Sequence, residues 1–301
     1  MKKLSNRRIF FAVLVLASAL GCGRCEAVEI VDSTGAKIKV PTHAERVVTL
    51  APSLSELVVE LSSSPSVALK RLVGVSEFSD FPPEVKKVRQ VGPYYRVHLE
   101  AVLGLRPDLV LATSDGNSQE QVSRLREAGV PVVVVATQSL KGIEESISLV
   151  AQALGERPRG EVMLTKLRSG LADIRKRNQS RTHPKVLLQV GDEPLVVAGG
   201  KSFLHEALET VGAVNVYADA QQAYPKPSLE DALRRNADTI LVLAMTDDLN
   251  PYQKFARKWE AFPSVSAVKN HRIKVIQGDR ILRPTLRLLD GLKELEKAIR
   301  E

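Results

Sequence analysis

The chain has 301 residues, of which 44% are hydrophobic and 26% charged, and its formal net charge is +8 at pH 7. These values are ordinary for a folded globular protein, and the length exceeds what one hydrophobic core usually organises, so we expect two domains. Basic residues alternate with Asp and Glu along the chain instead of forming one concentrated basic face, which argues against a nucleic-acid-binding protein.

Residues 1–27 have the layout of an export signal. Four basic residues within positions 2–8 precede an uncharged run from Ile9 to Gly21, which is too short for a permanent membrane span. Two places fit signal cleavage, Ala17-Ser18-Ala19 and Cys25-Glu26-Ala27, and Ala19-Leu20-Gly21-Cys22 resembles a lipoprotein box. We predict export to the periplasm, with Cys22 as a candidate site of lipidation.

Cysteine and histidine usage argues against a metal centre. Cys22 and Cys25 are the only cysteines, so the folded body offers neither an internal disulfide nor a thiolate ligand or nucleophile. The five histidines are scattered and lack the spacing of metal ligands. We therefore predict no metal site.

Alternating strands and helices predict an α/β lobe over residues 28–155. A hairpin is expected around Asp32-Ser33-Thr34-Gly35. Ser53 and Glu56 have the spacing of a capping box, so we expect them to begin a helix after the first buried strand. Short apolar runs, typical of buried parallel strands, occur at 46–50, 72–75, 109–112 and 132–136.

The middle of the chain is predicted to be helical. One apolar face covers residues 143–154 and ends at Gly155. A second amphipathic stripe follows, and a helix over about 158–177 would be ~30 Å long. We assign residues 156–178 to a helix that bridges two lobes.

Beyond residue 178 the alternation resumes and predicts a second lobe over 179–301. The expected strands are 185–190, 239–244 and 273–276, and the expected helices are 202–211 and 285–300.

A helix-then-strand unit occurs twice, at 98–111 and at 228–241, with Leu, Glu, Leu, Asp and Leu at matched offsets. A repeat this widely spaced indicates two similar lobes, because solenoid repeats have periods of ~20–50 residues. The predicted fold is therefore α/β, with two Rossmann-like lobes, one long bridging helix and a ligand cleft between the lobes.

Several motifs follow one another in a characteristic order. They are Arg46-Val47-Val48-Thr49-Leu50-Ala51-Pro52-Ser53, Leu72-Val73-Gly74-Val75-Ser76, Arg106-Pro107-Asp108-Leu109-Val110, Gly212-Ala213-Val214-Asn215-Val216 and Arg283-Pro284-Thr285-Leu286-Arg287. In this order the chain resembles periplasmic binding proteins of the cobalamin, ferric-siderophore and haem import class. The segments Phe78-Ser79-Asp80-Phe81-Pro82-Pro83 and Thr113-Ser114-Asp115-Gly116-Asn117 resemble most closely the cobalamin-binding branch of that class.

This resemblance implies a monomeric, non-catalytic receptor that captures cobalamin and delivers it to an inner-membrane permease dimer with ATPase subunits. The transported metal chelate would be its ligand, and it would need no cofactor of its own. Haem or a ferric siderophore is the alternative ligand within the class. A two-lobed metal-cofactor enzyme is the alternative outside it, although motifs such as GxSxG and HExxH are missing.

The resemblance also maps the first wall of the cleft. Tyr94 and Tyr95 stand in an irregular segment, where aromatic faces would suit a flat corrin or porphyrin, or would merely cap a loop. A tyrosinate could also ligate ferric haem iron. The residues expected on this wall are Pro52, Ser53, Phe78, Tyr94, Tyr95, Thr113, Asp115 and Asn117.

The second wall maps to the other lobe. Its arginines could donate to amide or acid groups of a ligand, and Arg287 could equally be a structural ion-pair partner. Cobalamin-binding relatives have tryptophans at the positions of Tyr94 and Thr113 and near Arg280, whereas this chain has only Trp259. The residues expected on this wall are Val197, Gly199, Tyr224, Arg280, Arg283 and Arg287.

Glu100 and Glu230 occupy the same offset in the two repeats, each following a Leu at a predicted helix start. The resemblance implies that each docks onto arginines of the membrane subunits. Independently, a carboxylate in a first helical turn interacts favourably with the helix dipole, by ~0.3–1 kcal/mol.

Overall fold

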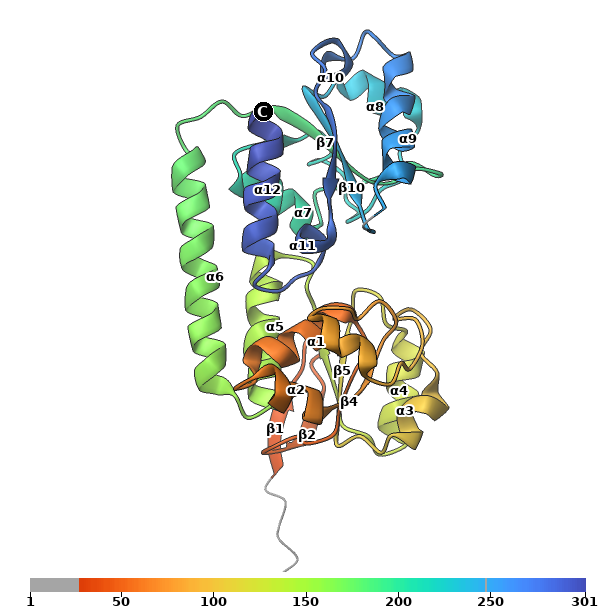
Figure 1. Ribbon diagram of the computed structural model, residues 1–301, viewed down its shortest axis with the longest axis vertical. Helices are drawn as coiled ribbons and strands as arrows, with labels where there is room; N and C mark the ends of the chain where they lie inside the picture. The colour runs from red at the N-terminus through yellow and green to blue at the C-terminus, as the bar shows by residue number, and fades with distance from the viewer. Residues whose placement is uncertain (1–26, 247) are drawn as a thin grey trace, which may run out of the picture.

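The computed structural model describes residues 27–246 and 248–301. The predicted export segment, with Cys22 and Cys25, lies outside the described residues apart from Ala27. Figure 1 shows two α/β lobes stacked along the long axis of the molecule, with one long helix, α6, running beside both. The predicted fold class is confirmed.

The first lobe is built on a parallel sheet with strand order β4-β3-β5-β6. An antiparallel hairpin, β1 (Ala27–Val31) and β2 (Lys37–Pro41), precedes it as predicted. All four predicted sheet strands are present: β3 (Val47–Thr49), β4 (Leu72–Val75), β5 (Leu109–Thr113) and β6 (Val132–Val135). The helices of this lobe are α1 (Pro52–Leu61), α2 (Pro65–Arg71), η1 (Pro83–Lys87), α3 (Leu99–Gly104), α4 (Gln119–Glu127) and α5 (Leu140–Ala153).

The capping box predicted for Ser53 and Glu56 is wrong. Helix α1 begins at Pro52, its N-cap is Ala51, and no side chain caps it. Proline suits the first helical position because its missing N–H would have had no helical partner there. Ser53 therefore lies inside the first turn, and Glu56 is free to bond elsewhere.

The second lobe is built on a sheet with strand order β11-β10-β7-β8, and β9 also pairs with β7. The closing helix begins at Leu288 instead of Thr285, and the hydroxyl of Thr285 contacts the first lobe. The strands are β7 (Lys185–Gly191), β8 (Val196–Val197), β9 (Val214–Asn215), β10 (Thr239–Ala244) and β11 (Ile273–Gln277). The helices are α7 (Phe203–Thr210), α8 (Leu229–Arg235), α9 (Asn250–Lys258), η2 (Trp259–Ala261), α10 (Ser266–Lys269), α11 (Asp279–Leu282) and α12 (Leu288–Arg300).

The sequence repeat corresponds to the same unit in each lobe. Helix α3 leads into β5, and α8 leads into β10, each an interior strand of its sheet. Asp108 accepts hydrogen bonds from the backbone N–H groups of Glu45 and Arg46, which precede β3. Asp238 accepts one from the N–H of Lys185, which begins β7. The repeated aspartate therefore fixes the start of the neighbouring strand in both lobes.

Helix α6 (Arg157–Asn178) has 22 residues, which corresponds to about 33 Å. Its buried face contacts α5 and α1 of the first lobe and α7 and α12 of the second. Helix α5 of the first lobe also contacts α7 of the second, so the lobes pack against each other beside α6. Within residues 27–246 and 248–301, none of the helices has both the length and the apolar character needed to cross a membrane.

Gly160 sets the distance between α5 and α6. A Cβ atom at position 160 would lie 2.5 Å from the Cβ of Ala151, far inside van der Waals contact. We expect Gly160→Ala to lower the free energy of unfolding by about 1–3 kcal/mol, because the two helices must separate. Thermal or urea unfolding measures this loss. The control is Gly104→Ala in α3, where no atom lies within 4 Å of the new Cβ; equal losses in both variants would contradict the packing argument.

Candidate ligand-binding cleft

The predicted aromatic pair lies at the inner edge of the first lobe. Tyr94 and Tyr95 are both exposed, and their rings meet edge to face with centroids 5.5 Å apart. The Tyr94 ring packs directly on Gly116, where any added Cβ would overlap it. The structure thus brings together the tyrosine segment and the loop 113–117, as the sequence analysis expected for one wall of a site.

Asn117 holds these segments in place. Its side-chain oxygen accepts from the N–H of Thr113 at 2.7 Å, and its amide nitrogen donates to the carbonyls of Leu50 at 2.8 Å and Tyr94 at 2.6 Å. Leu50 follows β3 and Thr113 ends β5, so the amide joins the carboxyl ends of two adjacent parallel strands. Pro52 begins α1 just beyond Leu50. Ligands of open α/β sheets characteristically bind at this edge.

Asp115 ties the same loop to the next strand. One of its carboxylate oxygens accepts from both the N–H and the hydroxyl of Thr137, at 2.5 and 2.6 Å, just beyond β6. Its own N–H donates to the hydroxyl of Thr113. The ends of β3, β5 and β6 are therefore braced by short polar side chains, leaving the aromatic rings as the exposed part of the wall.

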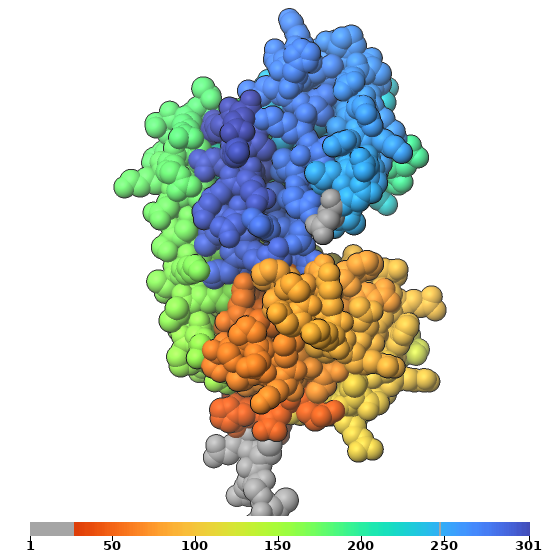
Figure 2. All heavy atoms as spheres, in the orientation of Figure 1, coloured from red at the N-terminus to blue at the C-terminus, as the bar shows by residue number. Residues whose placement is uncertain are grey.

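The second lobe contributes Tyr224 to the opposite wall. Val197 and Gly199 lie behind it: their N–H groups donate to the carbonyls of Pro225 and Ala223, on either side of Tyr224. Desolvation, and then the charges of Asp115 and Tyr94 on the facing lobe, raise the pKa of Tyr224 to about 12. Tyr224 therefore lies close enough to Asp115 and Tyr94 of the first lobe to interact with them electrostatically. Figure 2 shows a hollow between the lobes on the side away from α6.

The predicted arginines lie at the junction between the lobes. Glu56 of α1 is only 1% exposed, and its carboxylate accepts from Arg283 at 2.8 Å and Arg287 at 3.0 Å. The hydroxyl of Thr285 donates to the same carboxylate at 3.2 Å. The ion-pair role left open for Arg287 is the one that the structure shows.

Further carboxylates complete this junction. Arg283 also pairs with Asp80 at 2.7 Å and with Asp279 at 2.6 Å, while Arg287 pairs with Asp279 at 2.5 Å. The guanidinium of Arg287 lies 3.9 Å from the ring centroid of Phe81, a cation–π contact. Both arginines are already neutralised by carboxylates from both lobes.

Arg280 lies apart from this cluster. It pairs with Glu294 of α12 at 2.6 Å, and both side chains are substantially exposed. Its predicted ligand contact remains a prediction, as does that of the other residues assigned to the two walls.

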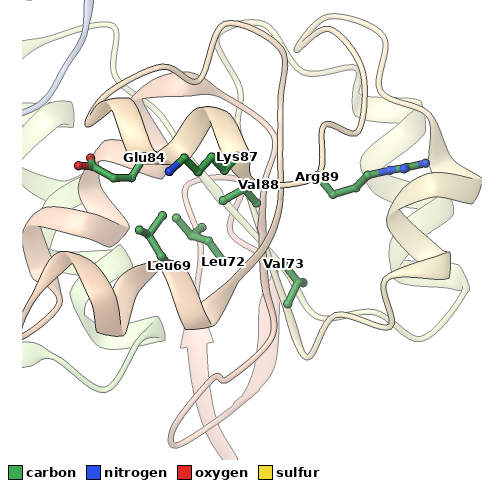
Figure 3. A pocket seen from close by; sticks show the side chains of 7 residues that line it. All are labelled: Leu69, Leu72, Val73, Glu84, Lys87, Val88 and Arg89. Carbon is green, nitrogen blue, oxygen red and sulfur yellow. The ribbon is translucent and has the colours of Figure 1, made fainter.

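Two further surface hollows lie outside the cleft. One, of about 370 Å³, is lined by Leu69, Leu72, Val73, Glu84, Lys87, Val88 and Arg89 of the first lobe. Figure 3 shows the side chain of Arg89 directed away from Leu69 and Leu72. The other, of about 390 Å³, is lined by Lys274, Val275, Ile276, Glu294, Lys297, Ala298 and Glu301. Each belongs to one lobe and contains no aromatic ring, unlike the cleft.

Comparisons with known proteins agree with this two-lobed arrangement. The family described as periplasmic binding protein matches residues 47–279. The chain belongs to this family. Proteins of the family are substrate-binding components of transport systems, which act outside the cytoplasm.

Three relatives illustrate the range within the family. The periplasmic vitamin B12 binding protein BtuF of Vibrio cholerae is 26% identical with a TM-score of 0.74, over 85% of this chain and 97% of the other. The periplasmic heme-binding protein RhuT of Roseiflexus has 26% identity and a TM-score of 0.73 over the same shares. An uncharacterized ABC transporter substrate-binding lipoprotein of Bacillus subtilis is 29% identical, with 98% of each chain covered.

Glu56 and its neighbour Glu60 have roles that were not expected from the sequence. They are the two charged residues of helix α1, and they are four residues apart, so they occupy one face. That pattern could have indicated a buried ionic contact. Within the part of the chain that the structure describes, no three His, Cys, Asp or Glu side chains are grouped as a metal site.

Glu60 lies at the edge of this junction with an unusual protonation equilibrium. Burial, and then the nearby charge of Glu56, raise its pKa to about 7, although the N–H of Leu286 and the charges of Arg287 and Lys166 act in the opposite direction. One of its carboxylate oxygens is buried without a hydrogen-bond partner among the described residues. The folded state therefore favours the protonated acid.

We expect the free energy of unfolding to depend less on pH between 4.5 and 8 in Glu60→Gln than in the unchanged protein. Because the folded-state pKa exceeds the ordinary value of 4.5, the stabilisation from this group is complete below pH 4.5 and is lost as the pH rises through 7. Relative to the unchanged protein, the variant should gain about 1–3 kcal/mol in free energy of unfolding between pH 4.5 and pH 8. Urea unfolding across that range measures it, with the exposed Glu127→Gln as control. A difference that does not change with pH would refute the assignment.

Proposed function

We propose that this chain captures a corrinoid outside the cytoplasm and delivers it to an ABC importer. The observation that carries the proposal is the pairing of aromatic walls across the cleft, with Tyr94 and Tyr95 on one lobe and Tyr224 on the other. Aromatic faces suit a flat, largely apolar macrocycle. The vitamin B12-binding relative supports this ligand class.

The charge state of the junction favours a neutral ligand. Arg283 and Arg287 are held by carboxylates, so they are poorly available to the two propionates of haem. A corrin periphery carries mainly amides, which need dipolar partners instead of free cations. The raised pKa of Tyr224 likewise disfavours a tyrosinate at that position.

Haem is the second candidate, because tyrosine can ligate ferric iron and the exposed Tyr94 and Tyr95 adjoin the cleft. The heme-binding relative supports this alternative. The two ligands make different demands on Tyr94: stacking requires only its ring, whereas iron ligation requires its phenol oxygen.

Tyr94→Ala should weaken binding of cyanocobalamin by about 1–3 kcal/mol, the usual loss for a central aromatic contact. Tyr94→Phe is the matched control, and it should bind normally because the ring is retained. Calorimetry with cyanocobalamin, haemin and a ferric hydroxamate measures affinity for each. Binding of haemin alone would refute the corrinoid proposal, and loss of that binding in Tyr94→Phe would identify an iron ligand.

The proposal includes the organisation inferred from the sequence. We take residues 1–27 as the export segment, 28–155 and 179–301 as the lobes and 156–178 as the bridge, in a monomeric protein. Cys22 would carry the lipid if the exported form is a lipoprotein, as in the Bacillus relative.

Glu100 and Glu230 are proposed to dock onto the permease dimer. Both are exposed in the first turns of α3 and α8. Figure 1 shows these helices on the side of the molecule opposite α6, one on each lobe. Matching carboxylates on two similar lobes would suit a partner with two-fold symmetry.

Reversing both charges, with Glu100→Arg and Glu230→Arg, should abolish uptake because like charges would then face each other at the docking surface. Ligand affinity of the purified protein should stay the same. The matched control reverses Glu127 of α4 and Glu260 of η2, two other exposed glutamates. Normal uptake of radiolabelled ligand by cells that depend on the double variant would refute the docking role.

A further inference from the structure

A short segment at the rim of the first lobe is held by two arginines of the second lobe. Arg283 donates to the carboxylate of Asp80 at 2.7 Å and to the carbonyl of Phe78 at 3.5 Å. Arg287 lies over the ring of Phe81. Side chains of the second lobe therefore hold residues 78–81 at three points: the carbonyl of Phe78, the carboxylate of Asp80 and the ring of Phe81.

Phe78 needs such support because its backbone conformation is unfavourable. Its φ is +65°, in the left-handed region that bulky side chains rarely adopt. The residue is 67% exposed, so burial of its ring does not offset this strain. Within the segment, the N–H of Ser79 donates to the carbonyl of Ser76 at 3.3 Å and the two serine hydroxyls are bonded at 3.2 Å, which closes a turn around Phe78 on its own lobe. The arginines of the second lobe add to this turn.

Arg283 is a rigid anchor for this purpose. Its side chain is 14% exposed. Glu56 pairs with the Nη1 atom of its guanidinium, and Asp279 pairs with the Nε atom. Because the guanidinium is planar and rigid, its remaining nitrogen, Nη2, is directed to Asp80 and Phe78. Asp80 is 44% exposed in its side chain, so it can be altered without leaving a buried charge unpaired.

We propose that Arg283 and Asp80 are positioning residues that hold Phe78 in its strained conformation, so that the exposed ring contacts the flat face of a ligand in the cleft. Arg283 acts through Asp80 and Phe78 and does not itself touch the ligand. The inference rests on the proposed function, because it requires a ligand with an apolar face. It also couples Phe78 to the arrangement of the lobes, since its anchor belongs to the second lobe.

The first test needs no ligand. Asp80→Asn removes the charge that Arg283 binds, and Glu84→Gln is the matched control, an exposed carboxylate a few residues along the chain. Hydrogen exchange of the amides at 77–81 should become about tenfold faster in Asp80→Asn and stay the same in Glu84→Gln, because only the first variant loosens the segment. Unchanged exchange in Asp80→Asn would overturn the proposal.

The second test asks whether Asp80 acts through Phe78. With cyanocobalamin as the titrated probe, or haemin if only haemin binds, Asp80→Asn should weaken binding about three- to tenfold. On a Phe78→Ala background it should have no further effect. Equal weakening on both backgrounds would overturn the proposal. If neither probe binds the unchanged protein, the proposed function fails, and the exchange measurement still decides whether the anchor holds the segment.

Discussion

One apolar core runs without interruption through both lobes, and the arrangement of the cleft depends on it. The same cluster of buried side chains extends from Ile30 in the first hairpin to Ile299 in the last helix. Leu167 and Leu171 of α6 lie in its middle. Because protein interiors are close-packed, separating the lobes would open this shared interior, not merely bend a linker. The cleft therefore has two walls with a nearly fixed spacing.

The ionic junction around Glu56 adds geometric definition to this core. Burying a charge pair often stabilises a protein no more than apolar residues would, because desolvation offsets the attraction. Removing one partner is a different matter and typically costs about 3–5 kcal/mol, since the remaining charge is left buried. Glu56 can satisfy its carboxylate only when Arg283, Thr285 and Arg287 of the second lobe are in place. The cluster thus favours one relative placement of the lobes.

The fold was predictable from sequence to the extent that it is repetitive and periodic. Apolar runs located the main strands, and the matched units at 98–111 and 228–241 indicated two lobes. Strands β8 and β9 have two residues each, too short to leave a pattern. Glu56 was predicted to cap a helix because a glutamate three residues after a serine fits a capping box. The same spacing is equally compatible with a buried glutamate that pairs with a distant arginine. Asp80 pairs with Arg283, and the amide nitrogen of Asn117 donates to Leu50 and Tyr94; all three partners are more than 20 residues away in the chain, so no local pattern reveals these contacts.

The two lobes are alike in their repeated helix-then-strand units and unlike in the segments that line the cleft. This difference corresponds to the two proposed kinds of recognition, of a transporter and of a ligand. Arg106 and Asn236 both adopt left-handed backbone conformations, each two residues before the repeated aspartate. The chain therefore passes from α3 to β5 and from α8 to β10 through similar turns. The cleft walls differ: loop 113–117 braces one, and strand β8 with segment 222–225 forms the other. A two-fold partner requires equivalent surfaces, whereas a ligand without two-fold symmetry requires unlike walls. Equivalent helix-then-strand units combined with unlike cleft walls are therefore what the docking and the ligand capture proposed above would require.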